Sequence, residues 1–198
     1  MRIGILTLQP HTNYGGILQA FALQTVLEHM GHNIQIFDCP FEPYKLPAWK
    51  KPLSYTKRFI KRYILQDKNT HINQEKVNFE RPKYFRQYTQ KFINDNLHRY
   101  LINKLSDIKK NDFDTIVVGS DQIWRMLYFK PFWKADRAAD AFLAFTNGWD
   151  IKRVAYAASF GTENSDIPEE EIEDCKAAIS KFNAVSVREE SGVKICKD

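Results

Sequence analysis

Cysteine is scarce in this chain of 198 residues, which has only Cys39, Cys175 and Cys196. Their odd number and wide spacing fit neither a disulfide framework nor a zinc site, and the pattern is typical of a reducing cytosol. No apolar run approaches the roughly 20 residues that a membrane-spanning helix needs. The first residues lack a basic stretch followed by an apolar one, so we expect no secretory signal. These absences predict a cytoplasmic protein.

Several common catalytic patterns are also missing from the sequence. No spacing of His, Cys, Asp and Glu suits a metal ion, and no Ser/His/Asp or Cys/His set stands out. Asp38 ends the second predicted strand, where an acid would hold a ribose in a dinucleotide site. However, the first loop is not G-x-G-x-x-G. We therefore expect no metal and no nicotinamide or flavin cofactor.

What the chain does contain is typical of a folded globular protein. Hydrophobic residues make up 43% and aromatic residues 14% of the sequence, which excludes a disordered chain. The length allows one good core and perhaps an insertion.

Predicted strands and helices alternate along the chain. Strand 2–8, helix 15–30 and strand 33–38 form one β-α-β unit, with Gly31 ending the helix and a right-handed crossover between parallel strands. Further elements follow in the second half: strands 113–118, 152–158 and 184–187, and a helix over 169–181. We therefore predict an α/β fold with a Rossmann-like parallel sheet flanked by helices.

Charge is distributed unevenly along the sequence. Residues 45–110 hold 17 Lys and Arg against 5 Asp and Glu, whereas the rest of the chain holds 12 against 19. Two helices, 54–66 and 74–96, are predicted in this basic part. We interpret 1–198 as a single Rossmann-like domain with a core of 1–39 and 111–198 and a basic helical insertion at about 40–110.

The helix predicted over 54–66 is amphipathic, which leaves two readings open. Apolar residues share one face and basic residues the other: Tyr55, Phe59, Ile60, Tyr63 and Ile64 against Lys57, Arg58, Lys61 and Arg62. The pattern suits peripheral contact with a membrane, at its inner face for a cytoplasmic protein. Packing of the apolar face on the sheet is the favoured alternative.

The same basic part has aromatic residues at helical spacing: Tyr84, Phe85, Tyr88 and Phe92. Such spacing is more typical of a packed helix than of a platform on which bases stack. We therefore expect no nucleic-acid partner.

Polar residues cluster where four predicted strands end. The clusters are 13–16, 119–122, 159–161 and 188–189. In an open parallel sheet these ends emerge at one edge, where ligands bind near the switch in strand order. We therefore predict that the four clusters converge. Substrate-binding residues would then include Ser120, Gln122, Ser159 and Glu189.

The first cluster places a glycine pair at the mouth of a helix. Asn13, Tyr14, Gly15 and Gly16 follow a buried strand and precede an apolar helical pattern. Glycine lets a ligand approach bare N–H groups, and the helix N-terminus favours negative charge. An anion or a polar small molecule is the expected guest. A plain strand-to-helix turn is the alternative.

Two charged residues are the candidate catalytic groups. Asp121 could orient or deprotonate a substrate hydroxyl, although Ser120 or Asp121 could instead cap a helix. Arg188 is the one basic residue in the four clusters, and its planar fork suits a carboxylate or phosphate. Pairing with Glu189 on the surface is the alternative. His11 could act as an acid or base, but a solvated loop histidine is more common.

Taken together and in order, these motifs resemble the polysaccharide pyruvyl transferase family. The resemblance is carried by residues 2–7, 13–20, 113–124, 155–161 and 186–189. It misses the basic middle, which looks like a variable insertion.

The resemblance implies transfer of enolpyruvyl from phosphoenolpyruvate to sugar hydroxyls, giving a pyruvate ketal on a cell-surface polysaccharide or its lipid-linked precursor. It also implies a GT-B-like enzyme with two Rossmann-like halves, of which this chain resembles the N-terminal half. On this view Asn13 to Gly16 line the crevice, Asp121 activates the sugar and Arg188 holds the donor. A missing second half would supply other groups, and the 198 residues alone are expected to be inactive.

Two other function classes remain compatible with the sequence. One is half of a nucleotide-sugar-dependent glycosyltransferase, since the GT-B architecture serves both. The other is a non-catalytic module that binds an anionic polymer or a membrane surface through its basic face. Fold alone does not choose between them.

Overall fold

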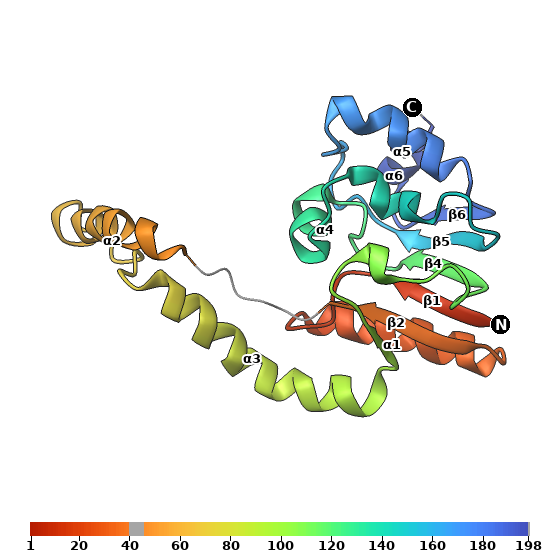
Figure 1. Ribbon diagram of the computed structural model, residues 1–198, viewed down its shortest axis with the longest axis horizontal. Coiled ribbons are helices and arrows are strands. Elements are labelled where there is room, and N and C mark those ends of the chain that lie inside the picture. Colours follow the sequence, from red (N-terminus) through yellow and green to blue (C-terminus); the bar gives the residue numbers. More distant parts are fainter. Residues whose placement is uncertain (40–45, 198) are drawn as a thin grey trace. The chain divides into compact units, whose positions relative to one another are not determined.

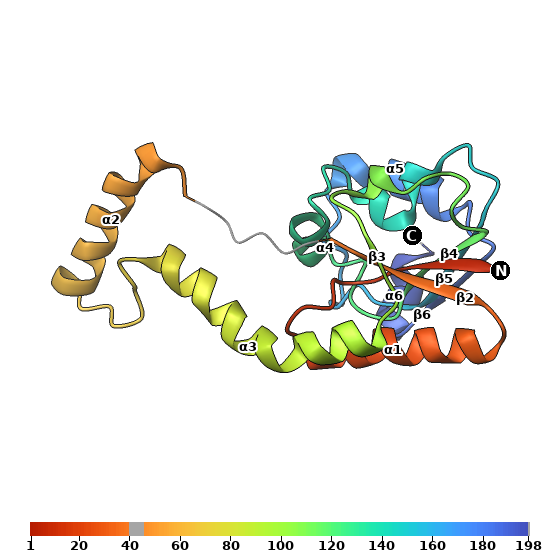
Figure 2. The same ribbon diagram turned by 60° about the horizontal axis from the view of Figure 1, so that its bottom comes forward.

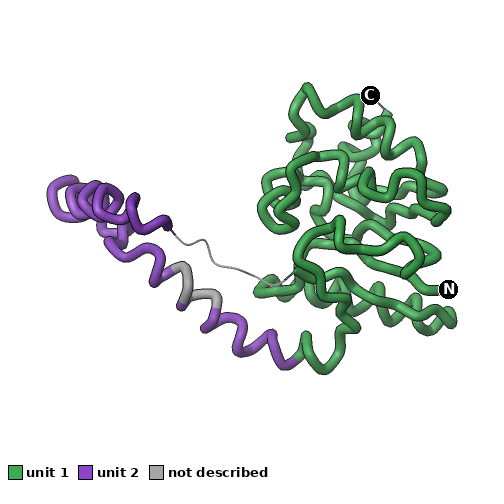
Figure 3. Tube along the Cα trace, viewed as in Figure 1, with its two compact units in different colours: residues 1–40, 92–198 green, residues 41–91 purple. Residues whose placement is uncertain are grey.

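The computed structural model describes residues 1–39 and 46–197, and these form two compact units. The first unit comprises residues 1–40 and 92–198, and the second comprises residues 41–91 (Figure 3). The sequence placed a basic insertion at about 40–110. Its predicted start lies outside the described residues, and residues 92–110 belong to the same unit as the sheet.

The first unit contains a six-stranded sheet in which every neighbouring pair is parallel. The strands are β1 (Arg2–Leu6), β2 (Asn33–Asp38), β3 (Arg99–Leu101), β4 (Thr115–Gly119), β5 (Lys152–Ala158) and β6 (Ala184–Val187). Their spatial order is β3-β2-β1-β4-β5-β6 (Figure 1). The chain reverses direction across the sheet between β1 and β4, which makes this pair the switch point. The predicted α/β parallel sheet is confirmed.

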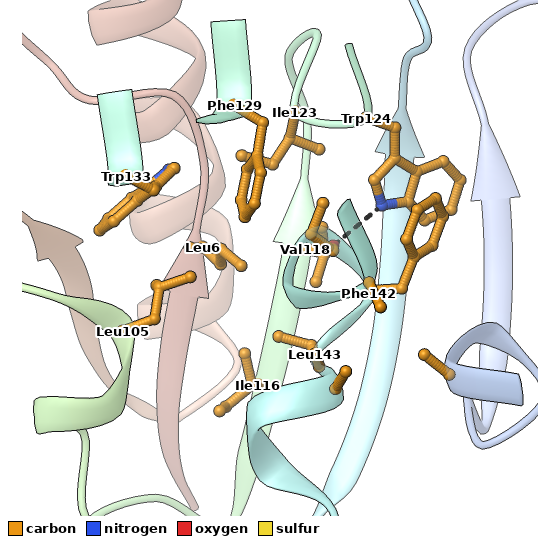
Figure 4. Close-up of a cluster of buried hydrophobic side chains, with 14 of the residues drawn as sticks. Leu6, Leu105, Ile116, Val118, Ile123, Trp124, Phe129, Trp133, Phe142 and Leu143 are labelled. Carbon is orange, nitrogen blue, oxygen red and sulfur yellow. Dashed lines mark hydrogen bonds between the residues drawn. The ribbon is translucent and has the colours of Figure 1, made fainter. Parts of the chain in front are cut away.

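Helices cover the sheet on both faces (Figure 2). On one face, α1 (Tyr14–His29) and the end of α3 (Gln74–Asn96) pack through Ile17, Leu23 and Ile93. On the other, α4 (Met126–Trp133) and α5 (Ile172–Ile179) pack in a larger cluster. Trp124 lies in this cluster, and its indole N–H donates to the carbonyl of Ala141 at 3.1 Å (Figure 4). Large buried side chains on both faces fix the strands that end at the predicted site.

Helix α1 shows how local sequence sets an element. Asn13 precedes it in an extended conformation and its side chain accepts the Gly16 N–H at 3.4 Å. The helix ends before Gly31, which has a φ of +83° that favours glycine. The sequence predicted helix 15–30, one residue displaced from the observed bounds.

Several elements differ from the sequence prediction. β3 and α4 were not predicted, because β3 has three residues and α4 contains Pro131. The helix predicted over 169–181 is a 3₁₀ turn, η6 (Glu169–Glu171), followed by α5. A last helix, α6 (Glu190–Ile195), follows β6.

Residues just before β4 are part of the core. Leu97 packs with α1, whereas Ile102, Leu105 and Ile108 pack on the other face of the sheet. Arg99 on β3 pairs with buried Asp38 at the end of β2, at 3.0 Å. Asp38 therefore helps to hold β3 against β2.

The second unit consists of α2 (Lys51–Phe59), a π-helical turn η2 (Ile60–Ile64), and most of α3. The sequence favoured packing of the apolar face of residues 54–66 on the sheet. Within the second unit the side chains of Phe59, Ile60, Tyr63 and Ile64 are exposed, and packing of this face on the sheet stays a prediction.

The aromatic residues of α3 belong to both units. Phe92 packs against the core of the first unit, and the side chains of Tyr84, Phe85 and Tyr88 are exposed in the second unit. The prediction that this row is a packed helix face is confirmed at Phe92 and stays a prediction at the other three positions. Across the two described ranges, no helix is long and apolar enough to cross a membrane.

Candidate functional site

The four polar clusters meet at the carboxyl edge of the sheet. They follow β1, β4, β5 and β6, and direct contacts join each cluster to the next. Asp121 lies against Gly16, the Asp121 carbonyl accepts the Ser159 N–H at 3.2 Å, and Arg188 donates to the Ser159 hydroxyl at 3.2 Å. The predicted convergence is confirmed, although contact alone gives these residues no function.

Asp121 and Gly16 meet across the switch point. A Cβ added to Gly16 would lie 3.0 Å from Oδ2 of Asp121. The other carboxylate oxygen of Asp121 accepts the Gln122 N–H at 2.8 Å, and the residue is 8% exposed. A carboxylate therefore sits beside the N-terminus of α1, where the helix dipole favours negative charge.

Gly119 sets the path of the chain out of β4. Its φ is +128°, and an added Cβ would lie 2.0 Å from the Tyr156 carbonyl oxygen on β5. The Gly119–Ser120 peptide is cis, and Ser120 itself is half-buried. Only glycine fits here, so the turn that delivers Asp121 to the rim requires it.

Neither Ser120 nor Asp121 caps a helix, contrary to the alternative reading of the sequence. The next helix, α4, begins at Met126. Its first N–H groups, from Met126 and Leu127, are accepted by the Asp166 carboxylate at 2.9 and 3.0 Å. Because the capping work falls to Asp166, Asp121 remains at the rim.

A second guanidinium lies at this edge, so Arg188 is not the one basic group there. Arg125 Nη1 donates to Gln122 Oε1 at 3.3 Å, and the guanidinium stacks on the Tyr128 ring at 4.7 Å. Sequence reasoning missed Arg125 because it stands just beyond the motif that ends at Trp124. Arg125 lies in the turn before α4, a helix that the sequence did not predict, so no sequence pattern pointed to this residue.

Gln122 and Gly161 connect the two arginines. A Cβ on Gly161, whose φ is +69°, would lie 2.5 Å from Gln122 Oε1. The Gly161 N–H donates to the Ser159 hydroxyl at 2.9 Å, and Arg188 Nη2 donates to the same oxygen. The groups from Arg125 to Arg188 therefore form one continuous row, which we call the arginine row: Arg125, Gln122, Gly161, Ser159 and Arg188.

Ser159 links Gly161 to Arg188 within the arginine row. It is fully buried, and its hydroxyl donates to Glu189 Oε1 at 2.6 Å. Arg188 also pairs with Glu189, with Nε 3.0 Å from Oε1. The predicted surface pairing of Arg188 with Glu189 is thus present, and it positions the guanidinium, which stays 38% exposed.

The electrostatics of the rim divide it into two parts. Asp121 places negative charge beside the glycine pair, so a second anion there would meet like-charge repulsion. Arg125, which follows β4, and Arg188, which follows β6 and pairs with Glu189, supply the two guanidinium groups of the arginine row. The anionic ligand that the sequence placed at Gly15 and Gly16 therefore suits the arginine row better. A ligand hydroxyl that donates a hydrogen bond suits Asp121.

The remaining residues of the first loop differ in exposure. Tyr14 is 55% exposed, and Asn13 and Gly15 are also exposed. His11 is buried, and its Nε2 lies 2.8 Å from Gln9 Oε1. The reading of His11 as a solvated loop residue is wrong.

A cavity of about 460 Å³ opens beside the arginine row, between α5, α6 and the loop after β5. Its lining is mostly apolar and includes Phe160, Ile172 and Cys175, but none of the predicted site residues. Burial raises the pKa of Cys175 to about 12, so its thiol stays protonated and is a poor nucleophile.

Comparison with known proteins identifies the family. The family model described as polysaccharide pyruvyl transferase matches residues 13–198, a range that begins at the first polar cluster and includes the other three. The chain belongs to the polysaccharide pyruvyl transferase family. The match also includes residues 41–91, so it does not set the second unit apart as an insertion. No curated protein and no solved structure matches the chain.

Membership of the pyruvyl transferase family agrees with the resemblance found in the motifs. The family name implies a transferase that acts on a polysaccharide.

Among residues 1–39 and 46–197, no group of His, Cys, Asp and Glu could hold a metal ion.

Proposed function

We propose that this chain binds phosphoenolpyruvate and a sugar acceptor for enolpyruvyl transfer. The product would be a pyruvate ketal on a cell-surface polysaccharide or its lipid-linked precursor, as in exopolysaccharide biosynthesis. The observation that supports this most is the arginine row, because phosphoenolpyruvate has a carboxylate and a phosphate that each suit a guanidinium.

The donor would lie along the arginine row. Arg125 and Arg188 would each take one anionic group, with Gln122 and Gly161 between them in the row. As the phosphate leaves, the developing negative charge would be stabilised by the guanidinium beside it.

The acceptor would lie at the Asp121 end of the rim. A carboxylate there can accept the proton of a sugar hydroxyl as its oxygen attacks the central carbon of the donor. Asn13 and the exposed Tyr14 would contact the sugar. The ketal forms from two sugar hydroxyls. The proton of one ends on the methyl group of the ketal and the proton of the other on the released phosphate, so the transfer needs no external oxidant or reductant.

The resemblance implies a GT-B-like enzyme with two Rossmann-like halves. We therefore propose to measure the binding of each substrate to this half directly.

Calorimetric titration distinguishes this function from nucleotide-sugar transfer. Phosphoenolpyruvate should bind with measurable heat, and UDP-glucose should not. Binding of UDP-glucose without phosphoenolpyruvate would instead support a glycosyltransferase half and overturn the proposal.

A further inference from the structure

Helix α2 and turn η2 turn their arginines inward. Arg58 makes two hydrogen bonds of 2.8 Å to the Glu75 carboxylate and one of 3.2 Å to the Ile72 carbonyl. Arg62 donates to the Thr70 carbonyl at 2.8 Å. The side chains of Arg58 and Glu75 are only 24% and 19% exposed. These contacts hold α2 and η2 against the start of α3 by their polar side.

The apolar side of the same helix is left open within the second unit. Trp49, in the 3₁₀ turn η1 (Ala48–Lys50) that leads into α2, is 77% exposed, and Leu53 is 79% exposed, with Ile60 and Ile64 further along the stripe in η2. These four residues follow at intervals of four and seven, so they share one helix face. Phe59 and Tyr63 widen the face, with ring centroids 4.7 Å apart. An exposed stripe of this size marks an interaction surface.

Lysines border this apolar face. Lys50 and Lys61 each follow a residue of the stripe by one position, Lys57 follows Leu53 by four, and all three lysines are exposed. Lys50 lies over the Trp49 ring at 4.7 Å. Lysine stems can lie along apolar surface while their ammonium groups reach outward, and tryptophan suits the boundary between lipid and water.

Charge selects the partner of this face. Residues 46–91 contain twelve Lys and Arg against three Asp and Glu. A second copy of this unit would meet strong like-charge repulsion, whereas a surface of anionic headgroups is complementary. We propose that α2 and η2 bind an anionic lipid surface, with Trp49, Leu53, Ile60 and Ile64 in the interface and the lysines at the headgroups. This binding uses no residue of the arginine row, so it stands or falls independently of the proposed function.

Vesicle sedimentation tests the proposal on the full chain. The protein should pellet with phosphatidylcholine vesicles that contain phosphatidylglycerol, should remain in solution with pure phosphatidylcholine, and should be released by added salt. Absence of pelleting, or equal pelleting with both vesicles, would overturn it. A dimer that forms without vesicle binding would also overturn it and identify a second copy as the partner.

Matched variants assign the binding to this face. Lys50→Glu with Lys57→Glu should abolish pelleting, whereas Lys109→Glu with Lys110→Glu, the same charge change at exposed lysines of the first unit, should retain it. Leu53→Ser with Ile60→Ser should also abolish pelleting without shifting the unfolding curve, because both side chains are exposed. Equal effects of the two charge variants would contradict the proposal.

Fluorescence gives a second readout on the same face. Trp49 emission should shift to the blue with phosphatidylglycerol vesicles, and Trp49→Phe should remove the shift. Trp124 and Trp133 are buried and Trp149 is half-buried in the first unit, so these three should not respond. A shift that survives Trp49→Phe would place the contact elsewhere and overturn the assignment.

Discussion

Asp121 lies against Gly16 across the β1–β4 switch point, with Oδ2 3.0 Å from where a Cβ on Gly16 would stand. The glycine lets the carboxylate come this close without a shift, and the carboxylate takes the place beside the helix N-terminus that an anionic ligand would otherwise occupy. The acceptor end of the proposed site follows from this contact, and its donor end follows from the arginine row, which runs from the loop after β4 to the end of β6.

The first prediction is the direction in which loss of the Asp121 charge changes the affinity for phosphoenolpyruvate. Asp121→Asn keeps an oxygen that can accept the Gln122 N–H but removes negative charge from the rim. Phosphoenolpyruvate should therefore bind with unchanged or tighter affinity, measured by calorimetry. Asp150→Asn, at an exposed position before β5 and so at the opposite edge, is the control. A loss of about tenfold or more at Asp121 would place the carboxylate on the donor side and contradict the assignment.

A pair of glycine variants tests the arginine row. Gly148→Ala and Gly161→Ala both place a side chain at positive φ, but only the Gly161 variant meets another residue, Gln122 at 2.5 Å. Each should lose about 1 kcal/mol of unfolding free energy from the backbone conformation. Gly161→Ala should also weaken phosphoenolpyruvate binding, because Gln122 must move. Equal affinity in the two variants would show that Gln122 does not shape the donor site.

Asp166 caps α4 and should therefore help to hold Arg125, which directly precedes this helix, in place. Asp166→Ala removes the acceptor of the Met126 and Leu127 N–H groups and should reduce stability by about 1 kcal/mol in urea unfolding. Asp166→Asn keeps one oxygen acceptor and should recover part of that loss. Unchanged stability of Asp166→Ala would mean that water replaces the carboxylate at no loss.

Glu171 should make stability depend on pH in the acid range. The hydrogen bond from Lys130 (2.5 Å), with a further one from the Ala138 N–H, lowers the pKa of Glu171. A lowered folded-state pKa stabilises the protein above the usual range of glutamate, and this stabilisation is lost as pH falls through the folded-state pKa.

Glu171→Gln should therefore be less stable than the unmodified chain by about 1 kcal/mol at neutral pH. The difference should close at acid pH, where Glu171 is protonated in both states. Glu173, with an 85% exposed side chain, is the matched control, and Glu173→Gln should show no such difference. A gap between Glu171→Gln and the unmodified chain that stays constant down to strongly acid pH would contradict the cause given for the pKa shift.

Much of the fold was predictable from periodicity and glycine. Strands 33–38, 152–158 and 184–187 and helix 74–96 have their predicted bounds, because each is marked by an apolar pattern and a clear stop. Strand β3 and helix α4 were missed, since three residues give no period and Pro131 suggests a break.

The site was predictable in position but not in detail. Parallel strands must end at one edge, so the meeting of Gly16, Asp121, Ser159 and Arg188 followed from topology alone. The carboxylate beside Gly16, the cap from Asp166 and the second guanidinium at Arg125 depend on how loops return to the rim. Hydrophobic patterning also assumes that an apolar face points inward, and the inward arginines of α2 and η2, Arg58 and Arg62, break that assumption.

The most direct measurement of the central claim is the affinity of phosphoenolpyruvate for variants of the two guanidinium groups. Arg125→Gln and Arg188→Gln should each weaken calorimetric binding about tenfold. Arg2→Gln, at the amino end of β1 and paired with Asp114, should bind as the unmodified chain does. Phosphoenolpyruvate binding that is unaffected by both rim variants would contradict the account.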